Sequence, residues 1–124
     1  MTMPNSKCLT PGMSATLTTT GGPVLVMANI GGVWVFDAEG CTEATFFLVM
    51  DNTVISAHAI YWTNGGDYLS TENMVSWQVP AAGKHTFQVQ EADYNWCGTY
   101  DQTVVGGQEA SGMSSTRTLI VREF

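Results

Sequence analysis

Apolar and polar residues alternate with a period of two along much of this 124-residue chain, and turn residues interrupt the alternation. A period of two is typical of β-strands, because successive side chains point to opposite faces of a sheet. No segment of useful length carries the 3.6-residue period of an amphipathic helix. The pattern predicts strands at residues 13–18, 24–29, 33–37, 44–50, 53–62, 74–79, 84–90 and 116–124. We therefore predict an all-β domain of about eight strands.

Turn residues divide these segments. Gly21-Gly22-Pro23 and Asp51-Asn52 favour turns, and Gly31-Gly32 permits either a turn or a bulge. Residues 91–115 are polar and glycine-rich, and their pattern is ambiguous. Spacing of this kind is typical of a sandwich or a jelly roll. We predict an extended N-terminal arm at 1–12, followed by one domain at 13–124.

Several predicted strands are apolar on both faces, notably 24–28, 46–50 and 119–121. One face of an antiparallel sheet normally meets water and is polar, so a second apolar face needs cover, which a neighbouring subunit can supply. The alternative is that these are central strands of a single core. Trp34 and Trp77 are predicted to be core residues. The residues expected in a subunit interface are Phe46, Leu48, Met50, Ile120 and Phe124.

The charge balance narrows the class of partner. Charged residues make up only 12% of the chain, with 11 acidic against 4 basic side chains and a net charge of −7. The basic residues are scattered, whereas nucleic-acid binding needs clustered Lys and Arg, and the acidic balance disfavours anionic lipid. No apolar stretch is long enough to span a membrane, and Met1 to Pro11 does not resemble a secretory signal. We expect neither nucleic acid nor membrane as a partner.

The residues that usually carry catalysis lack their usual spacing. His58 and His85 fit no metal-binding pattern, and a hydrogen-bonded structural role is expected for each. There is no GxSxG motif, and Cys97 has no histidine near it in sequence. Eleven carboxylates make a glycosidase-like pair uninformative. We expect no enzyme activity, no cofactor and no metal.

Three cysteines, Cys8, Cys41 and Cys97, show no CxxC spacing. Free thiols and one Cys41–Cys97 disulfide both stay open. Calcium is the most reasonable ion if one binds, because loop carboxylates and amides offer hard oxygen ligands. Ordinary turn residues are the favoured interpretation of that set, which comprises Asp51, Asn52, Asp67, Glu91, Asp93, Asn95 and Asp101.

Aromatic residues cluster with polar ones in two segments, which is the composition of a carbohydrate site. Sugar rings pack their C–H faces on aromatic planes, while carboxylates and amides hold the hydroxyls. The alternative is that these aromatics fill the ends of the sandwich or face another subunit. The candidate ligand-binding residues are Tyr94, Trp96, Tyr100, Asp93 and Asp101 in one cluster, with Tyr61 and Trp62 in the other.

Four segments together resemble a family of small jelly-roll domains. They are SATLTTTGGPVLVMANIGG (14–32), FFLVMDNTVIS (46–56), SWQVPAAGKHTFQVQ (76–90) and STRTLIVREF (115–124). Such domains occur in phage tail-fibre and capsid-associated proteins and in bacterial collagen-like proteins. They are similar in turn to trimeric jelly rolls of the complement and tumour-necrosis-factor type. The quoted motifs are structural, and none is catalytic.

This resemblance implies an antiparallel jelly-roll homotrimer with its two-sided apolar strands buried at a threefold axis. It also implies a virion structural protein, assembled in the host cytoplasm, with the major capsid protein or a tail protein as partner. The short arm in place of a stalk favours a capsid-decoration subunit over a fibre tip. The alternative is an extracellular adhesin that binds a cell-surface glycan through the aromatic clusters.

Overall fold

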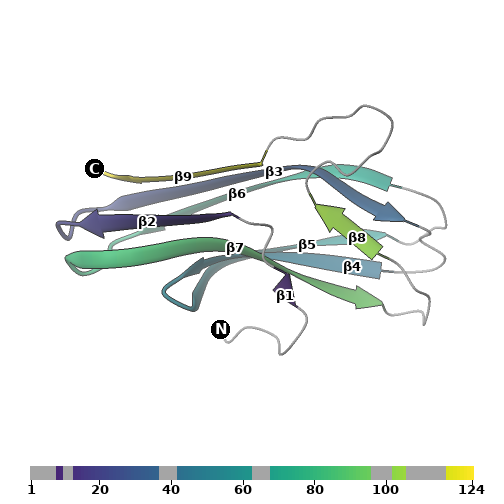
Figure 1. Ribbon diagram of the computed structural model, residues 1–124, viewed down its shortest axis with the longest axis horizontal. Coiled ribbons are helices and arrows are strands. Elements are labelled where there is room, and N and C mark those ends of the chain that lie inside the picture. Colours follow the sequence, from purple (N-terminus) through teal and green to yellow (C-terminus); the bar gives the residue numbers. More distant parts are fainter. Residues whose placement is uncertain (1–7, 10–12, 37–41, 63–67, 96–101, 106–116) are drawn as a thin grey trace.

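A computed structural model describes residues 8–9, 13–36, 42–62, 68–95, 102–105 and 117–124, and the statements below concern these residues. The described chain is all-β and forms two antiparallel sheets packed as a sandwich (Figure 1). This confirms the predicted all-β class with antiparallel sheets and is consistent with the predicted sandwich. None of the described residues belongs to a helix long and apolar enough to cross a bilayer.

Sheet A contains five strands and has β7 and β4 at its centre. Strand β4 pairs with β5 on one side and with β7 on the other, while β1 and β2 both pair with the far edge of β7. All of these pairings are antiparallel. The strands are β1 (Cys8–Leu9), β2 (Ser14–Thr19), β4 (Thr42–Met50), β5 (Thr53–Trp62) and β7 (Gly83–Asn95).

Sheet B is built around one long strand, β3 (Val24–Phe36). Strand β6 (Tyr68–Gln78) pairs along one edge of β3. The first half of β3 pairs with β9 (Arg117–Glu123), and its second half pairs with β8 (Gln102–Val105). The consequence for function is that β6, β3 and β9 lie side by side and present one continuous outer face.

The observed strands differ from the predicted ones mainly in length. The segments predicted at 24–29 and 33–37 form the single strand β3, and its register against β6 shifts between Ile30 and Val33. Gly31-Gly32 therefore occupies a bulge and not a turn, consistent with the freedom of glycine at such irregularities. The predicted strand at 53–62 matches β5, and Asp51 and Asn52 both have positive φ in the turn before it.

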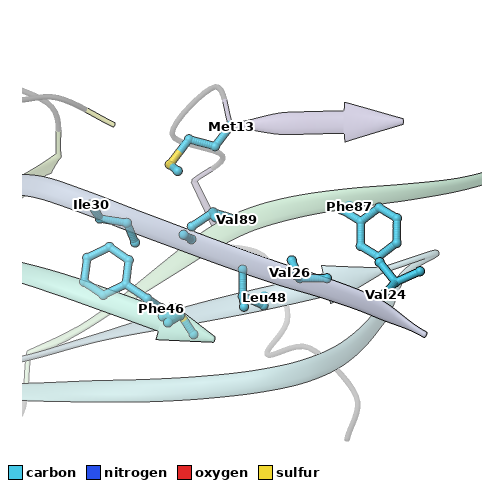
Figure 2. Close-up of a cluster of buried hydrophobic side chains, with 10 residues drawn as sticks. Met13, Val24, Val26, Ile30, Phe46, Leu48, Phe87 and Val89 are labelled. Atoms are coloured by element: carbon cyan, nitrogen blue, oxygen red, sulfur yellow. The ribbon is translucent and has the colours of Figure 1, made fainter. Parts of the chain in front are cut away.

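The core lies between the two sheets (Figure 2). It takes alternate side chains from facing strands, as period-two patterning requires. Burying a side chain such as Phe46 or Leu48 contributes about 1.5–3 kcal/mol relative to exposure. The buried cluster consists of Met13, Val24, Val26, Ala28, Ile30, Phe46, Leu48, Met74, Phe87 and Val89.

The last residues of the chain close one side of the sandwich, where β9 of sheet B lies near β2 of sheet A. The Glu123 carboxylate accepts hydrogen bonds from the backbone N–H of Thr20 (2.8 Å) and of Gly22 (2.7 Å). The Phe124 N–H also donates to the Pro23 carbonyl oxygen at 2.8 Å. These contacts join the end of β9 to the β2–β3 turn and hold the backbone of Phe124 in place.

Candidate functional site

The outer faces of the two sheets differ in polarity. On sheet A, the outward positions of β2 and β7 are polar, with Thr16 and Thr18 exposed beside Lys84. Two apolar outward residues of β4, Phe47 and Val49, are themselves buried in a small second cluster. The outer face of sheet A is therefore polar and open to water along β2 and the start of β7, and covered at Phe47 and Val49.

The outer face of sheet B is apolar over most of its described length. In one row, Met27 of β3 lies between Val75 of β6 and Ile120 of β9. In the next row, Leu25 lies between Trp77 and Arg122. We define the apolar face as Leu25, Met27, Val75, Trp77, Val79, Ile120 and Phe124. Among the described residues, all six exposed large hydrophobic side chains belong to this face: Met27, Val75, Trp77, Val79, Ile120 and Phe124.

An aromatic group forms one end of the apolar face. The rings of Trp77 and Phe124 lie with centroids 5.5 Å apart and planes inclined by 35°, so the end of β6 and the end of the chain meet across β3. The guanidinium carbon of Arg122 lies 4.9 Å from the centre of the Phe124 ring. At this range the cation is attracted to the electron-rich face of the ring. Arg122 is thereby held against the aromatic group.

A polar row borders the other end of the apolar face. Asn29 of β3 lies between Asn73 of β6 and Thr118 of β9. The Asn29 side-chain amide donates to the Asn73 side-chain oxygen at 2.6 Å. The two rows described above and this polar row together contain one charged residue, Arg122, and no carboxylate. The face is thus nearly neutral, in a chain with a net charge of −7.

The predicted core position of Trp77 is wrong, because 54% of this side chain is exposed. Strand β6 directs Met74 and Ser76 inward and turns Val75 and Trp77 outward. The period-two pattern correctly places Val75, Trp77 and Val79 on one face, but it cannot say which face is buried. Trp34 lies in β3, and its side chain is outside the part of the structure that we describe.

The five predicted interface residues separate into two groups. Phe46 and Leu48 have no exposed surface and belong to the core, and Met50 packs against that core. Ile120 and Phe124 are exposed at 48% and 60% and lie on the apolar face. The structure therefore brings two of the five together on the surface, next to Trp77, Val75 and Met27, which sequence reasoning did not assign to an interface.

His85 joins the β4–β5 turn to the start of β7. Its Nδ1 lies 2.5 Å from Asp51 Oδ2, and its Nε2 lies 2.7 Å from the carbonyl oxygen of Ala81. Asp51 also accepts from the Thr86 N–H through Oδ1 at 2.9 Å. Hydrogen bonds from Thr86 and His85 lower the pKa of Asp51, and those with Asp51 and Ala81 raise the pKa of His85. The pair acts as a cross-link between two turns.

His58 of β5, an edge strand of sheet A, forms an ion pair with Glu72 of β6, an edge strand of sheet B. The imidazole of His58 is well exposed on β5, whereas the Glu72 carboxylate on β6 is nearly buried. Ser76 adds a long hydrogen bond to the Ile55 carbonyl oxygen at 3.4 Å. Both histidines are thus partnered, in line with the structural role expected for them.

The strand register brings parts of the two aromatic clusters together at one end of sheet A. Glu43 of β4 lies opposite Tyr61 of β5 on one side and opposite Tyr94 of β7 on the other. In the row on one side of Glu43, Thr42 lies between Trp62 and Asn95, and in the row on the other side, Ala44 pairs with Asp93. Because the two clusters lie far apart in the sequence, the sequence alone did not predict that they meet. Trp96, Tyr100 and Asp101 lie outside the described residues, as do Asp67, Cys41 and Cys97.

Within the described part of the chain, no three His, Cys, Asp or Glu side chains lie close enough to share a metal ion. Asp51 and Asn52 line an open depression with Thr86 and Gln88, but Asp51 is engaged by His85 and Thr86.

Comparisons with protein-family models, with curated proteins and with solved structures found no match to this chain. The residues themselves therefore carry the functional argument.

Proposed function

We propose that this chain is a non-enzymatic structural protein of a virion, a jelly-roll subunit that associates with copies of itself and decorates a phage capsid or a tail appendage. The observation that carries this proposal is the order of the strands in the two sheets. Jelly-roll domains are the common building block of viral capsid proteins, and their cores are filled from two facing sheets. A homotrimer is the assembly that the sequence resemblance favours.

In a jelly roll with strands numbered along the chain, the two sheets have the orders 2-7-4-5 and 1-8-3-6. Sheet A has the order β2-β7-β4-β5. In sheet B, β9 and β6 flank β3, which corresponds to 8-3-6 when β9 is taken as the eighth strand. Seven of the eight positions thus have a counterpart. Position 1 has none in the described structure, because β1 pairs with β7 in sheet A, and β8 is a short addition that pairs with the second half of β3.

The four segments that resemble phage jelly rolls coincide with well-defined strands. They cover β2 with much of β3, the β4–β5 hairpin, the β6–β7 connection, and β9. The apolar outer face of sheet B supports association, because exposed large hydrophobic side chains that lie side by side are a feature of interaction sites. The exposed polar side chains of β2 on the outer face of sheet A suit the side of a subunit that meets water.

The direct test has two steps. Native mass spectrometry of the purified chain at micromolar concentration should show an oligomer, with a trimer as the expected species. Mass spectrometry of gradient-purified virions from the source of the sequence should then detect the chain at a fixed ratio to the major capsid or tail protein. A stable monomer that is absent from particles would overturn the proposal.

A second candidate function is glycan binding at the end of sheet A where Tyr61 and Tyr94 flank Glu43 in register. Tyrosine and glutamate are residue types that sugar sites use, because aromatic planes stack on sugar rings and carboxylates accept hydrogen bonds from hydroxyls. On a glycan array, Tyr94→Ala and Trp96→Ala should abolish binding that the wild type shows. Thr16→Ala, on the exposed outer face of β2, is the control and should leave it intact. Absence of wild-type binding removes this candidate.

A further inference from the structure

We propose that the apolar face of sheet B is the surface on which a second copy of this chain docks. This inference rests on the proposed function, which requires self-association, and it names the surface that performs it. The two central rows, Val75–Met27–Ile120 and Trp77–Leu25–Arg122, form the middle of the contact, and Asn73–Asn29–Thr118 forms part of its rim.

The exposure of these side chains is not explained by the fold of one chain. Val75 is 61% exposed and Val79 is 68% exposed, while the polar residues Glu72 and Ser76 of the same strand are buried. Strand β6 therefore turns its more apolar side away from its own core. A large aromatic anchor in a ring of smaller apolar residues is also the usual composition of the centre of a protein interface. Trp77, in contact with Phe124, supplies that anchor.

The charge distribution favours a second copy as the occupant. Each chain carries a net charge of −7, so two copies repel one another unless they meet where acidic residues are absent. The three rows of the face contain no carboxylate, and their one cation, Arg122, lies against the Phe124 ring. A basic partner would seek carboxylates, and anionic lipid would be repelled by the remainder of the chain.

The polar rim is compatible with identical copies. Where the same face of three identical copies converges on a threefold axis, each residue lies near residues of its own kind and must tolerate them. Apolar side chains satisfy this condition without regard to sign. Amides do as well, since Asn29 and Asn73 each carry both donors and an acceptor, as their mutual hydrogen bond at 2.6 Å illustrates.

The test compares three variants with the wild type by sedimentation velocity and native mass spectrometry over a hundredfold range of concentration. Val75→Glu places a charge in the centre of the face and should shift the population to monomer. Ile120→Lys introduces the opposite charge and should have the same effect, which excludes a simple increase in net repulsion. Thr16→Glu adds the same charge as Val75→Glu on the exposed outer face of sheet A and should leave the oligomer intact.

Thermal unfolding followed by circular dichroism verifies that each variant is folded. Dissociation of both apolar-face variants, with retention of the oligomer by Thr16→Glu, is the supporting result. If the wild type is oligomeric and both apolar-face variants stay oligomeric, the surface assignment is overturned while the proposed function stands. If the wild type is monomeric throughout, both are overturned.

Discussion

The His85 ring lies between two acceptors, the Asp51 carboxylate and the Ala81 carbonyl oxygen. A neutral imidazole has one N–H and can donate to only one of them, whereas an imidazolium donates to both. Strand β2, which pairs with the start of β7, contains no titratable residue. The other charged residue close to His85 in sequence is Lys84. The local geometry therefore matches the protonated ring, consistent with the raised pKa of His85.

Replacing Asp51 with Asn should make stability less dependent on pH. The pKa of His85 is raised above 6.5, so its contribution is complete below pH 6.5 and is lost as pH rises through the folded-state pKa. The pKa of Asp51 is lowered below 3.8, so its contribution is present above pH 3.8 and is lost as pH falls through that lower pKa. Both contributions are complete between pH 3.8 and pH 6.5, so the stability advantage of the wild type over Asp51→Asn should be largest in that range.

Urea unfolding at a series of pH values measures this difference. Asn is a suitable replacement because it tolerates the positive φ of 48° at this position and keeps an acceptor for the Thr86 N–H. His85→Gln in the same series should give a similar profile, since it removes the other half of the pair. A wild-type advantage that persists unchanged at pH 9 would contradict the assignment.

Gly22 lies where the end of the chain meets the β2–β3 turn, and substitution should be costly. A Cβ at this position would lie 2.7 Å from the Phe124 carbonyl oxygen and 3.0 Å from Glu123 Oε1. Gly22→Ala must therefore displace backbone and weaken the hydrogen bonds to Glu123, a loss of about 1–3 kcal/mol. Thr20→Ala loses only one exposed hydroxyl contact to Glu123 and should cost less. Equal melting temperatures for the two variants would argue against this close contact.

At the scale of single strands, the sequence predicts extent and alternation better than orientation. Strand β5 and the Asp51-Asn52 turn follow from period-two patterning and turn chemistry. The orientation of β6 does not, because patterning favours burial of Val75 and Trp77, whereas the structure buries Met74 and Ser76. A strand with one more apolar side is expected to bury that side in the core of its own chain, and β6 does the opposite.

The same limit explains the outcome for the predicted interface. Strand β4 is apolar on both sides, and it is a central strand of sheet A, so Phe46 and Leu48 face the core while Phe47 and Val49 are buried on the other side. Strand β9 pairs only with β3 in the described structure, and it leaves Ile120 exposed. Hydrophobicity identified both strands, but only the sheet order distinguishes core from surface.

Leu48→Ala tests the position of β4 in the core. Leu48 is fully buried among the side chains between the sheets, and truncation leaves a cavity there. We expect a loss of about 2–5 kcal/mol in the free energy of unfolding. Because this contact lies within one chain, the loss should appear equally at low and high protein concentration. Val75→Ala, on the exposed face of β6, is the control and should change chemical unfolding of the monomer by much less.

For the whole molecule, the two outer faces imply different environments. Sheet A presents threonine and lysine side chains to solvent, and sheet B presents Val75, Trp77 and Phe124. A sandwich with one polar and one apolar outer face is suited to an assembly in which one side is covered. The same arrangement separates the proposed self-contact from the aromatic residues Tyr61 and Tyr94, which lie on the other sheet.

The response of association to salt follows from this separation of charge and apolar surface. Copies with a charge of −7 repel through solvent, and raising ionic strength from 0.05 to 0.5 M shortens the screening length from about 14 Å to about 4 Å. An apolar contact loses nothing by this screening, whereas a contact made of ion pairs weakens. We expect sedimentation velocity to show more oligomer at high salt for the wild type and no comparable gain for Val75→Glu. Dissociation of the wild type by salt would instead indicate that acidic and basic side chains hold the copies together, which is incompatible with docking through a face whose rows contain Arg122 as their one charge.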